Sequence, residues 1–306
     1  MSPAAINQNR LFQEGSCTIG DALESLRTHL QGASQGISEP HFLKMGLANV
    51  DESFGGLALG AVTVLASRPS MGRSALALNI ATNVSLSQNR TVLYMSLGMP
   101  IWQLAIRVAS QIGGIQARAL QLGKLSPDEQ GRFALAIKQL QDAPLHLIHC
   151  SYIDIDTLCQ RVREFASHQA VEHPLALVIV DDLDHAYLQK QEKCLDAAYE
   201  KVMYLLKKLA KDLHVAVLVL SGVKRTAEER ENKRPIFTDL PSVALAQQSD
   251  ALLFLYRDEV YHPQSKDIGR AELTMVSNRL GLTGTVYLPT DLQYGRFGVD
   301  AYRSLE

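Results

Sequence analysis

The chain has 306 residues, with 30 Lys and Arg against 32 Asp and Glu, so its formal net charge is −2. This balance gives no global positive field that would attract nucleic acid or a membrane surface, so any nucleic-acid contact must be local. The apolar runs, such as 175–180 and 215–220, are far shorter than the roughly 18 residues that a membrane span needs. Residues 1–15 lack the apolar core of a secretory signal, which predicts a cytoplasmic protein without membrane segments.

A short amphipathic helix is predicted near the start of the chain, over residues 18–31. Thr18 is a suitable N-cap, and Asp21 lies in the first turn, where the helix dipole favours a negative charge. The helix carries an apolar stripe at helical spacing: Ile19, Leu23, Leu26 and Leu30. Because such a stripe must be covered, we expect the helix to dock on another part of the fold or on a neighbouring subunit.

The composition suggests three regions along the chain. Residues 1–17 are polar and are predicted to form a flexible N-terminus. The Gly- and Ser-rich stretch 31–39 is typical of a linker, so we assign residues 18–45 to a helix and a linker. Residues 46–306 are predicted to form the main domain.

The main domain alternates apolar strands with helices. Strands are expected at 61–66, 91–96, 145–149, 175–180 and 215–221. Helices are expected between them at 74–87, 100–113, 127–141, 157–168 and 196–212. The strands are continuous apolar runs, which is typical of a parallel sheet covered on both faces, and strands with hairpin-like spacing follow Ala251. The fold class is therefore α/β.

One segment, 224–234, is dense in charge. Its Lys, Arg and Glu side chains have both signs, which is most typical of a solvated surface loop. We therefore predict an exposed loop at this position.

A candidate phosphate-binding loop follows the first strand of the main domain. In the motif GxxxxGK[ST], backbone N–H groups and a helix N-terminus cradle phosphate, the Lys reaches its oxygens, and the hydroxyl holds Mg²⁺. Gly72 and Ser74 fit this motif, but Ser67 replaces the first Gly and Arg73 replaces the Lys. Arginine keeps the charge but is bulkier than lysine. The residues expected to bind the phosphates are Ser70, Met71, Gly72, Arg73 and Ser74.

A second element of the same site is predicted at the end of the strand 175–180. This strand delivers Asp181 to the carboxyl edge of the sheet, where α/β folds bind ligands and where a Walker B Asp coordinates Mg²⁺. We therefore expect Ser74 and Asp181 to be the metal ligands, with ATP and Mg²⁺ as cofactors.

Several segments, in this order, resemble the C-terminal RecA-like motor domain of the bacterial replicative helicase DnaB family, over roughly residues 18 to 300. They are Ala66–Gly72, Ser96–Pro100, Val180-Asp181, Leu220-Ser221, Lys233–Pro235, Asp239-Leu240 and Tyr256–His262. The resemblance implies a RecA-like P-loop fold and a role in DNA replication. It also implies that helix 18–31 docks on an adjacent subunit, in a homo-oligomer or in a hetero-oligomer with a helicase, and that the family's N-terminal helical domain is not part of this chain.

The chain departs from the family pattern at positions that the family uses for chemistry. The family's catalytic Glu, which polarises the attacking water, is Gly98 here, and glycine cannot orient a water. Arg279 matches the family's arginine finger, which acts on a neighbouring subunit, although it could equally be an ordinary surface arginine. The family's DNA-contacting loop corresponds to 239–244, where its basic and Gly residues are absent, so DNA binding stays open. Asp182 or Asp184 could replace the missing Glu.

Three functions follow from these features. The favoured one is a helicase paralogue that binds ATP with weak or no hydrolysis and acts as a partner or regulator of a replication assembly, a pseudoenzyme in effect. The alternative is an active ATP-dependent helicase motor. The third, a small-molecule phosphotransferase, lacks a readable substrate pocket or base.

Overall fold

The computed structural model describes residues 18–34, 41–169, 173–183, 195–279 and 281–298, and the predicted flexible segment 1–17 lies outside them. The chain divides into two compact units, residues 1–42 and 43–306. The described helix of the first unit is α2 (Ile19–Ser34), and the N–H of Asp21 donates to Thr18 Oγ1 at 3.2 Å, as expected of an N-cap. The helix continues past residue 31, so the linker prediction was wrong for 32–34. A single glycine at position 32 costs only about 1 kcal/mol, which does not end a helix.

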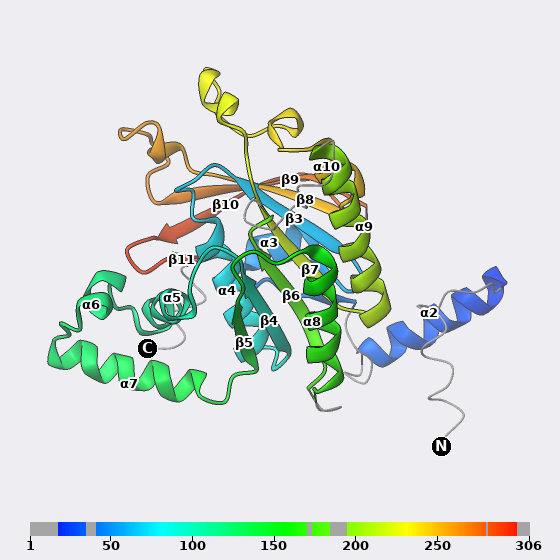
Figure 1. Cartoon of the computed structure of the whole chain (residues 1–306), viewed down its shortest axis with the longest axis horizontal. Coiled ribbons are helices and arrows are strands. Elements are labelled where there is room, and N and C mark those ends of the chain that lie inside the picture. Colours follow the sequence, from blue (N-terminus) through cyan, green and yellow to red (C-terminus); the bar gives the residue numbers. More distant parts are fainter. Residues whose placement is uncertain (1–17, 35–40, 170–172, 184–194, 280, 299–306) are drawn as a thin grey trace. The chain divides into compact units, whose positions relative to one another are not determined.

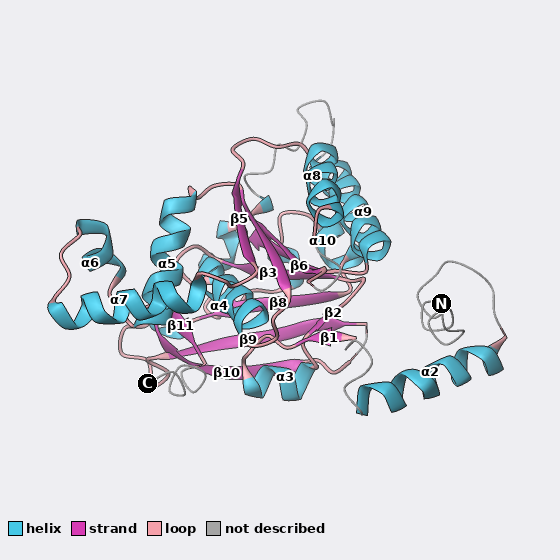
Figure 2. Ribbon diagram, turned by 90° about the horizontal axis from the view of Figure 1, so that it is seen from below, coloured by secondary structure: helices cyan, strands magenta, loops and turns pink. Residues whose placement is uncertain are grey.

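The second unit is built on a nine-stranded sheet with the strand order β11-β10-β9-β8-β3-β7-β6-β4-β5 (Figures 1 and 2). The strands are β3 (Val62–Ser67), β4 (Thr91–Ser96), β5 (Leu145–His149), β6 (Leu175–Asp181), β7 (Ala216–Gly222), β8 (Ala251–Tyr256), β9 (Arg270–Asn278), β10 (Gly284–Asp291) and β11 (Arg296–Phe297). The six strands from β8 to β5 are parallel, and β9 and β10 continue the sheet in antiparallel fashion. A separate two-stranded sheet pairs β1 (Phe42–Leu43) with β2 (Leu57–Ala58). The prediction of a mainly parallel sheet with added C-terminal strands is confirmed.

Helices cover both faces of the sheet. They are α3 (Ala48–Phe54), α4 (Arg73–Leu86), α5 (Ile101–Gly113), α6 (Ala117–Leu122), α7 (Pro127–Leu140), α8 (Ile155–Ser167), α9 (Leu195–Leu213) and α10 (Val243–Gln248). In β3, Leu65 packs with residues of α4 and α5, whereas Val64 and Ala66 pack with residues of α9 and α10 on the other face (Figure 1). Burial on both faces explains why the central strands β3, β4, β6 and β7 are nearly continuous in apolar residues. In the described part of the chain, we find no helix with the length and apolar character needed to cross a membrane.

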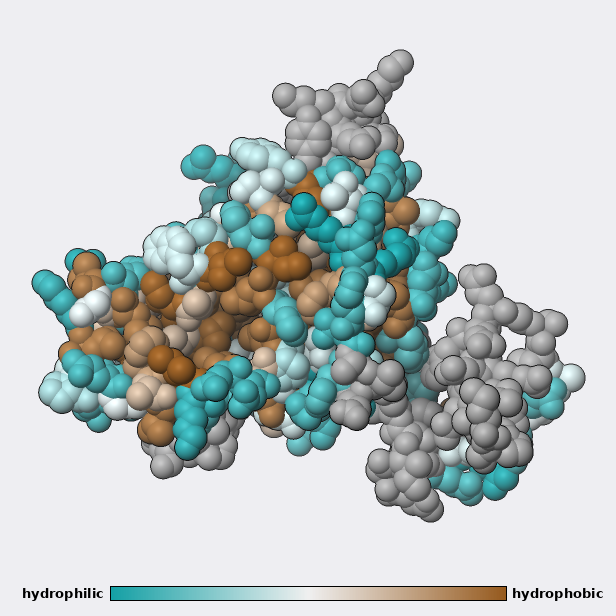
Figure 3. All heavy atoms as spheres, turned by 60° about the horizontal axis from the view of Figure 1, so that its bottom comes forward, coloured by the Kyte–Doolittle hydropathy of each residue, from teal (hydrophilic) through white to brown (hydrophobic). Residues whose placement is uncertain are grey.

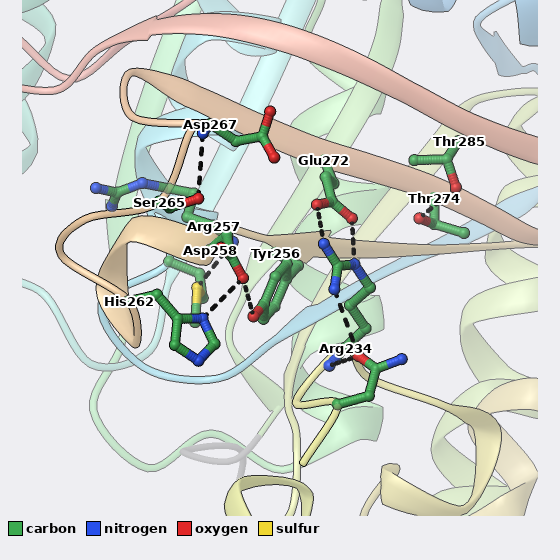
Figure 4. A network of polar contacts seen from close by, with 12 residues as sticks. Arg234, Tyr256, Arg257, Asp258, His262, Ser265, Asp267, Glu272, Thr274 and Thr285 are labelled. Atoms are coloured by element: carbon green, nitrogen blue, oxygen red, sulfur yellow. Dashed lines mark hydrogen bonds and ion pairs between the residues drawn. The ribbon is translucent and has the colours of Figure 1, made fainter. Parts of the chain in front are cut away.

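The charged segment 224–234 is more structured than predicted. Lys224 and Arg225 are exposed, but Arg230 holds the buried carboxylate of Asp239 with two contacts of 2.6 and 2.7 Å. Arg234 makes a similar two-point contact with Glu272 (Figure 4). Most of the segment is exposed, as predicted, Arg234 included, but these two arginines also bind carboxylates that lie outside the segment.

Candidate nucleotide-binding site

The predicted phosphate loop connects β3 to α4 at the carboxyl edge of the parallel strands. Two of its residues, Ser70 (φ 68°) and Gly72 (φ 96°), have left-handed backbone conformations. At Gly72 a side chain would also collide with Phe297, because a Cβ would lie 2.8 Å from Cζ of that ring. Gly72 is the N-cap of α4, and the first N–H groups of a helix lack intrahelical acceptors. The loop therefore presents donors and a helix N-terminus, as phosphate binding requires.

The loop is held in place by arginines outside its phosphate-binding turn. The Met71 side chain is buried, and its Sδ accepts from the backbone N–H of Arg257 at 3.3 Å. Arg257 also donates from Nη1 to the Ser70 carbonyl at 3.1 Å. Arg68 forms an ion pair of 2.9 Å with Glu228. Met71 thus anchors the loop through its side chain, and it is the one predicted phosphate-binding residue that does not line the cavity beside the loop.

Arg73, at the position of the motif's lysine, is paired with an acidic residue of the same chain. Its Nη2 lies 2.6 Å from Oδ2 of Asp182, and both side chains are less than 15% exposed. Its Nη1 donates to the Ser67 carbonyl at 3.3 Å and also to the Ser221 carbonyl at the end of β7. Because β6 ends at Asp181, Asp182 is free to turn toward the loop, where it neutralises the loop's own cation. This pairing has no sequence signal, since the partners are far apart along the chain.

The two predicted metal ligands lie together. Ser74 Oγ donates to Asp181 Oδ1 at 3.2 Å, and the buried hydroxyl of Tyr94 donates to Asp181 Oδ2 at 2.6 Å. Burial raises the pKa of Asp181, and the hydrogen bonds from Tyr94 and Ser74 oppose that rise. The sequence analysis did not identify Tyr94. The one indication in the sequence is that its hydroxyl is a polar group within an otherwise apolar strand.

The oxygen pair of Ser74 and Asp181 fits a magnesium ion. Mg²⁺ prefers oxygen ligands and is usually held by one or two protein groups together with substrate phosphates and water. A cation would also relieve the desolvation of the Asp181 carboxylate. The described residues contain no group of three or more His, Cys, Asp or Glu side chains arranged to hold a metal.

Replacing Asp181 by asparagine is expected to change both stability and metal-dependent binding. Because the folded-state pKa of Asp181 is raised, its contribution to stability is present below the ordinary carboxyl pKa and is lost as pH rises through the raised value. The unfolding free energy of Asp181→Asn should therefore fall less between acidic and neutral pH than that of the wild type. Loss of a charged ligand should also weaken Mg²⁺-dependent nucleotide binding by about tenfold or more.

Urea unfolding at acidic and neutral pH, together with nucleotide titrations with and without Mg²⁺, would measure both effects. The exposed Asp142→Asn variant removes the same charge outside the site and serves as the control. An Asp181→Asn variant with the pH dependence and Mg²⁺ response of the wild type would contradict this role.

A cavity of about 630 Å³ opens beside the loop. It is bounded by the phosphate loop, α5, α6 and the turn 292–295 that connects β10 to β11. Four arginines line it, with no acidic residue among the lining residues that the structure describes: Arg68, Arg73, Arg107 and Arg257. Met99, Ile106 and Leu292 add apolar surface. A site of this size, with cations at one end and apolar groups nearby, suits an organic molecule that carries phosphates.

The position of the family's catalytic Glu contributes no side chain to the site. Gly98 lies between β4 and α5 and is exposed, while the next residue, Met99, lines the cavity. Of the two acids considered as replacements, Asp182 is bound to Arg73, and Asp184 lies outside the described residues.

Arg279 is not close to the phosphate loop of its own chain. It follows β9, which runs antiparallel to β8 and therefore ends where β8 and β3 begin, at the opposite edge of the sheet. Its Nη2 donates to the Gln247 carbonyl at 3.1 Å, Nη1 lies 3.7 Å from Asp250, and its side chain is 53% exposed. Any role of Arg279 in phosphate chemistry would therefore concern another subunit.

The segment 239–244 has an inward-facing acid and no cation. Asp239 is buried against Arg230, and its carboxylate also accepts from the Ile236 N–H at 2.8 Å. Ser242 is buried too, and its Oγ accepts from the Ala244 N–H at 3.1 Å, which caps α10. This segment therefore offers no basic side chain to a nucleic-acid backbone.

Known proteins resemble the chain over most of its length. Residues 43–299 match the family described as the DnaB-like helicase C terminal domain. The replicative DNA helicase DnaB of Geobacillus stearothermophilus is 32% identical over 259 residues, which cover 82% of this chain and 55% of that relative. The replicative DNA helicase DnaC of Bacillus subtilis (strain 168) is 29% identical over the same shares. The chain thus spans about half the length of the curated relatives it matches.

Solved structures agree with the sequence relatives. The ATPase domain of G40P superposes with a TM-score of 0.84 at 26% identity, over 92% of this chain and 99% of that one. A DnaB-like replicative helicase, whose structure was determined together with its interactions with primase, superposes with a TM-score of 0.81 at 26% identity, over 93% of this chain and 67% of that one. The fold is therefore the RecA-like ATPase fold of these helicases, and the chain belongs to the family of DnaB-like helicase C-terminal domains.

Proposed function

We propose that this protein is a nucleotide-binding member of a replication helicase assembly, in which ATP and Mg²⁺ bind at the loop but hydrolysis is weak or absent. The main support is the state of Arg73, whose guanidinium is bound to Asp182 and to two carbonyl groups. The absence of a carboxylate at Gly98 adds to it, since removing one catalytic base lowers rates by about 10² to 10⁴.

A titration with Mg²⁺-ATP, read for heat of binding and for phosphate release, tests this function. We expect binding without measurable turnover. The Arg73→Ala variant is the informative comparison, because it removes the loop's cation. Turnover by the wild type that disappears in Arg73→Ala would contradict the proposal and support an active motor.

The alternative, an active ATP-dependent helicase motor, is favoured by one observation. The Asp182 carboxylate lies at the loop itself, 2.6 Å from Arg73, and is therefore close to where a water-orienting acid would be needed. For this function Asp182 would have to leave Arg73 when nucleotide binds.

The partner of α2 is the second part of the proposal. Ile19, Leu23 and Leu26 are exposed within the described part of the helix, and such a stripe gains stability when it is covered. We propose that it docks on a neighbouring subunit, either a second copy or an active helicase. Exposed apolar side chains on α6 and α7, namely Leu122, Leu135 and Ile137, provide surface of the kind that subunit contacts bury, and apolar surface is visible at the left of Figure 3.

A further inference from the structure

Helix α5 lines the cavity opposite the phosphate loop. Gln103, Arg107 and Gln111 follow one another at a spacing of four residues, so they lie on one face of the helix, and all three line the cavity. Gln111 is fully buried, and its Nε2 donates to the carbonyls of Ala75 at 3.0 Å and Gly295 at 2.9 Å. These bonds fix α5 against the first turn of α4, so the backbone of α5 that carries Arg107 is held beside the loop.

The four arginines of the cavity differ in what they bind. Arg68, Arg73 and Arg257 each pair with a carboxylate, from Glu228, Asp182 and Glu259 respectively. Arg107 is exposed and forms neither an ion pair nor a hydrogen bond within the described residues. It therefore carries a positive charge that no acid of the site neutralises.

The charge of Arg107 also acts on Tyr94, which donates a hydrogen bond to Asp181. Burial, and then the charge and hydrogen bond of Asp181, raise the pKa of Tyr94, whereas the positive charges of Arg107 and Arg73 lower it. Tyr94 donates to Asp181, so the charge of Arg107 acts on the same part of the site as Arg73.

We propose that Arg107, rather than Arg73, is the principal side chain that binds the nucleotide's polyphosphate. A guanidinium without a partner can form two charge-assisted hydrogen bonds to phosphate oxygens, whereas Arg73 would first have to give up Asp182. This inference rests on the proposed nucleotide binding and identifies the residue that recognises the phosphates. Arg107 takes over the electrostatic role that lysine has in an unaltered loop. The backbone N–H groups of the loop still donate hydrogen bonds to the phosphates.

Isothermal titration of the full chain with ATP and with AMP tests this assignment. Arg107→Gln should weaken ATP binding by about tenfold to a hundredfold, since a hydrogen bond to a charged group contributes on that scale, and should weaken AMP binding less. Arg107→Lys, which keeps the charge without the fork, should be intermediate. Arg118→Gln is the matched control, because Arg118 is an exposed arginine of α6 that does not line the cavity.

The outcomes separate this inference from the function on which it rests. A wild type that binds no ATP would refute the proposed function, and the role of Arg107 with it. A wild type that binds ATP, with Arg107→Gln binding equally well, would refute only the role of Arg107. Equal losses in Arg107→Gln and Arg118→Gln would also refute it, because they would show a general charge effect. Circular dichroism checks that the variants are folded.

Discussion

Replacing Arg234 by alanine is expected to lower the free energy of unfolding by about 2 kcal/mol, because it leaves a buried carboxylate, Glu272, without its charged hydrogen-bond donor, although the Arg234 side chain itself is 44% exposed. Arg234 holds Glu272 through Nε at 2.7 Å and Nη2 at 2.6 Å, and the Glu272 side chain is only 6% exposed (Figure 4). The same guanidinium lies 4.8 Å above the ring of Tyr256. Without Arg234, Glu272 would be a buried carboxylate with no counterion.

Urea denaturation, with the midpoint and slope fitted for both proteins, would measure this loss. The control is Lys201→Ala, which breaks an exposed ion pair with Asp156, and it should change stability by less than about 1 kcal/mol. Similar losses in both variants would mean that the Arg234 pair behaves as a surface contact. Arg234→Lys should be intermediate, because lysine keeps the charge but cannot form the two-point contact.

In a mixed assembly with an active DnaB-family helicase, Arg279→Ala in this chain should slow ATP hydrolysis at the shared interface by about a thousandfold, the scale of a lost arginine finger. The reason is positional. Arg279 lies at the sheet edge opposite its own phosphate loop, and its half-exposed guanidinium donates one hydrogen bond and lies 3.7 Å from Asp250 within the part of the chain that the structure describes. Arg279 is therefore remote from the phosphate loop of its own chain, so a role in hydrolysis would require the nucleotide of a neighbouring subunit.

Phosphate release from mixtures of the two proteins, at increasing shares of this chain, would measure the effect. Arg270→Ala is the matched control, since Arg270 is an exposed arginine at the other end of the same strand, β9. Equal turnover with wild-type and Arg279→Ala chains would show that Arg279 is an ordinary surface arginine.

The secondary structure was largely readable from the sequence. The bounds of β4 and β5 were predicted to the residue. For β4 the reason is that a strand buried on both faces shows as a nearly uninterrupted apolar segment. The motif around Gly72 likewise placed the start of α4 to within one residue. The segment 224–234 is largely exposed, as predicted, but nothing in the sequence indicated that two of its arginines bind carboxylates outside the segment.

The sequence alone determined the α/β fold class and the position of the candidate phosphate loop, and it predicted that Ser74 and Asp181 would lie together. These depend on local patterns and on the rule that parallel strands deliver their ends to one edge. The tertiary structure decided which charges neutralise one another: it binds Arg73 to Asp182 and, among the described residues, gives Arg107 no acidic partner. Arg73 and Asp182 are 109 residues apart in the sequence, and no local sequence pattern indicates a contact at that separation.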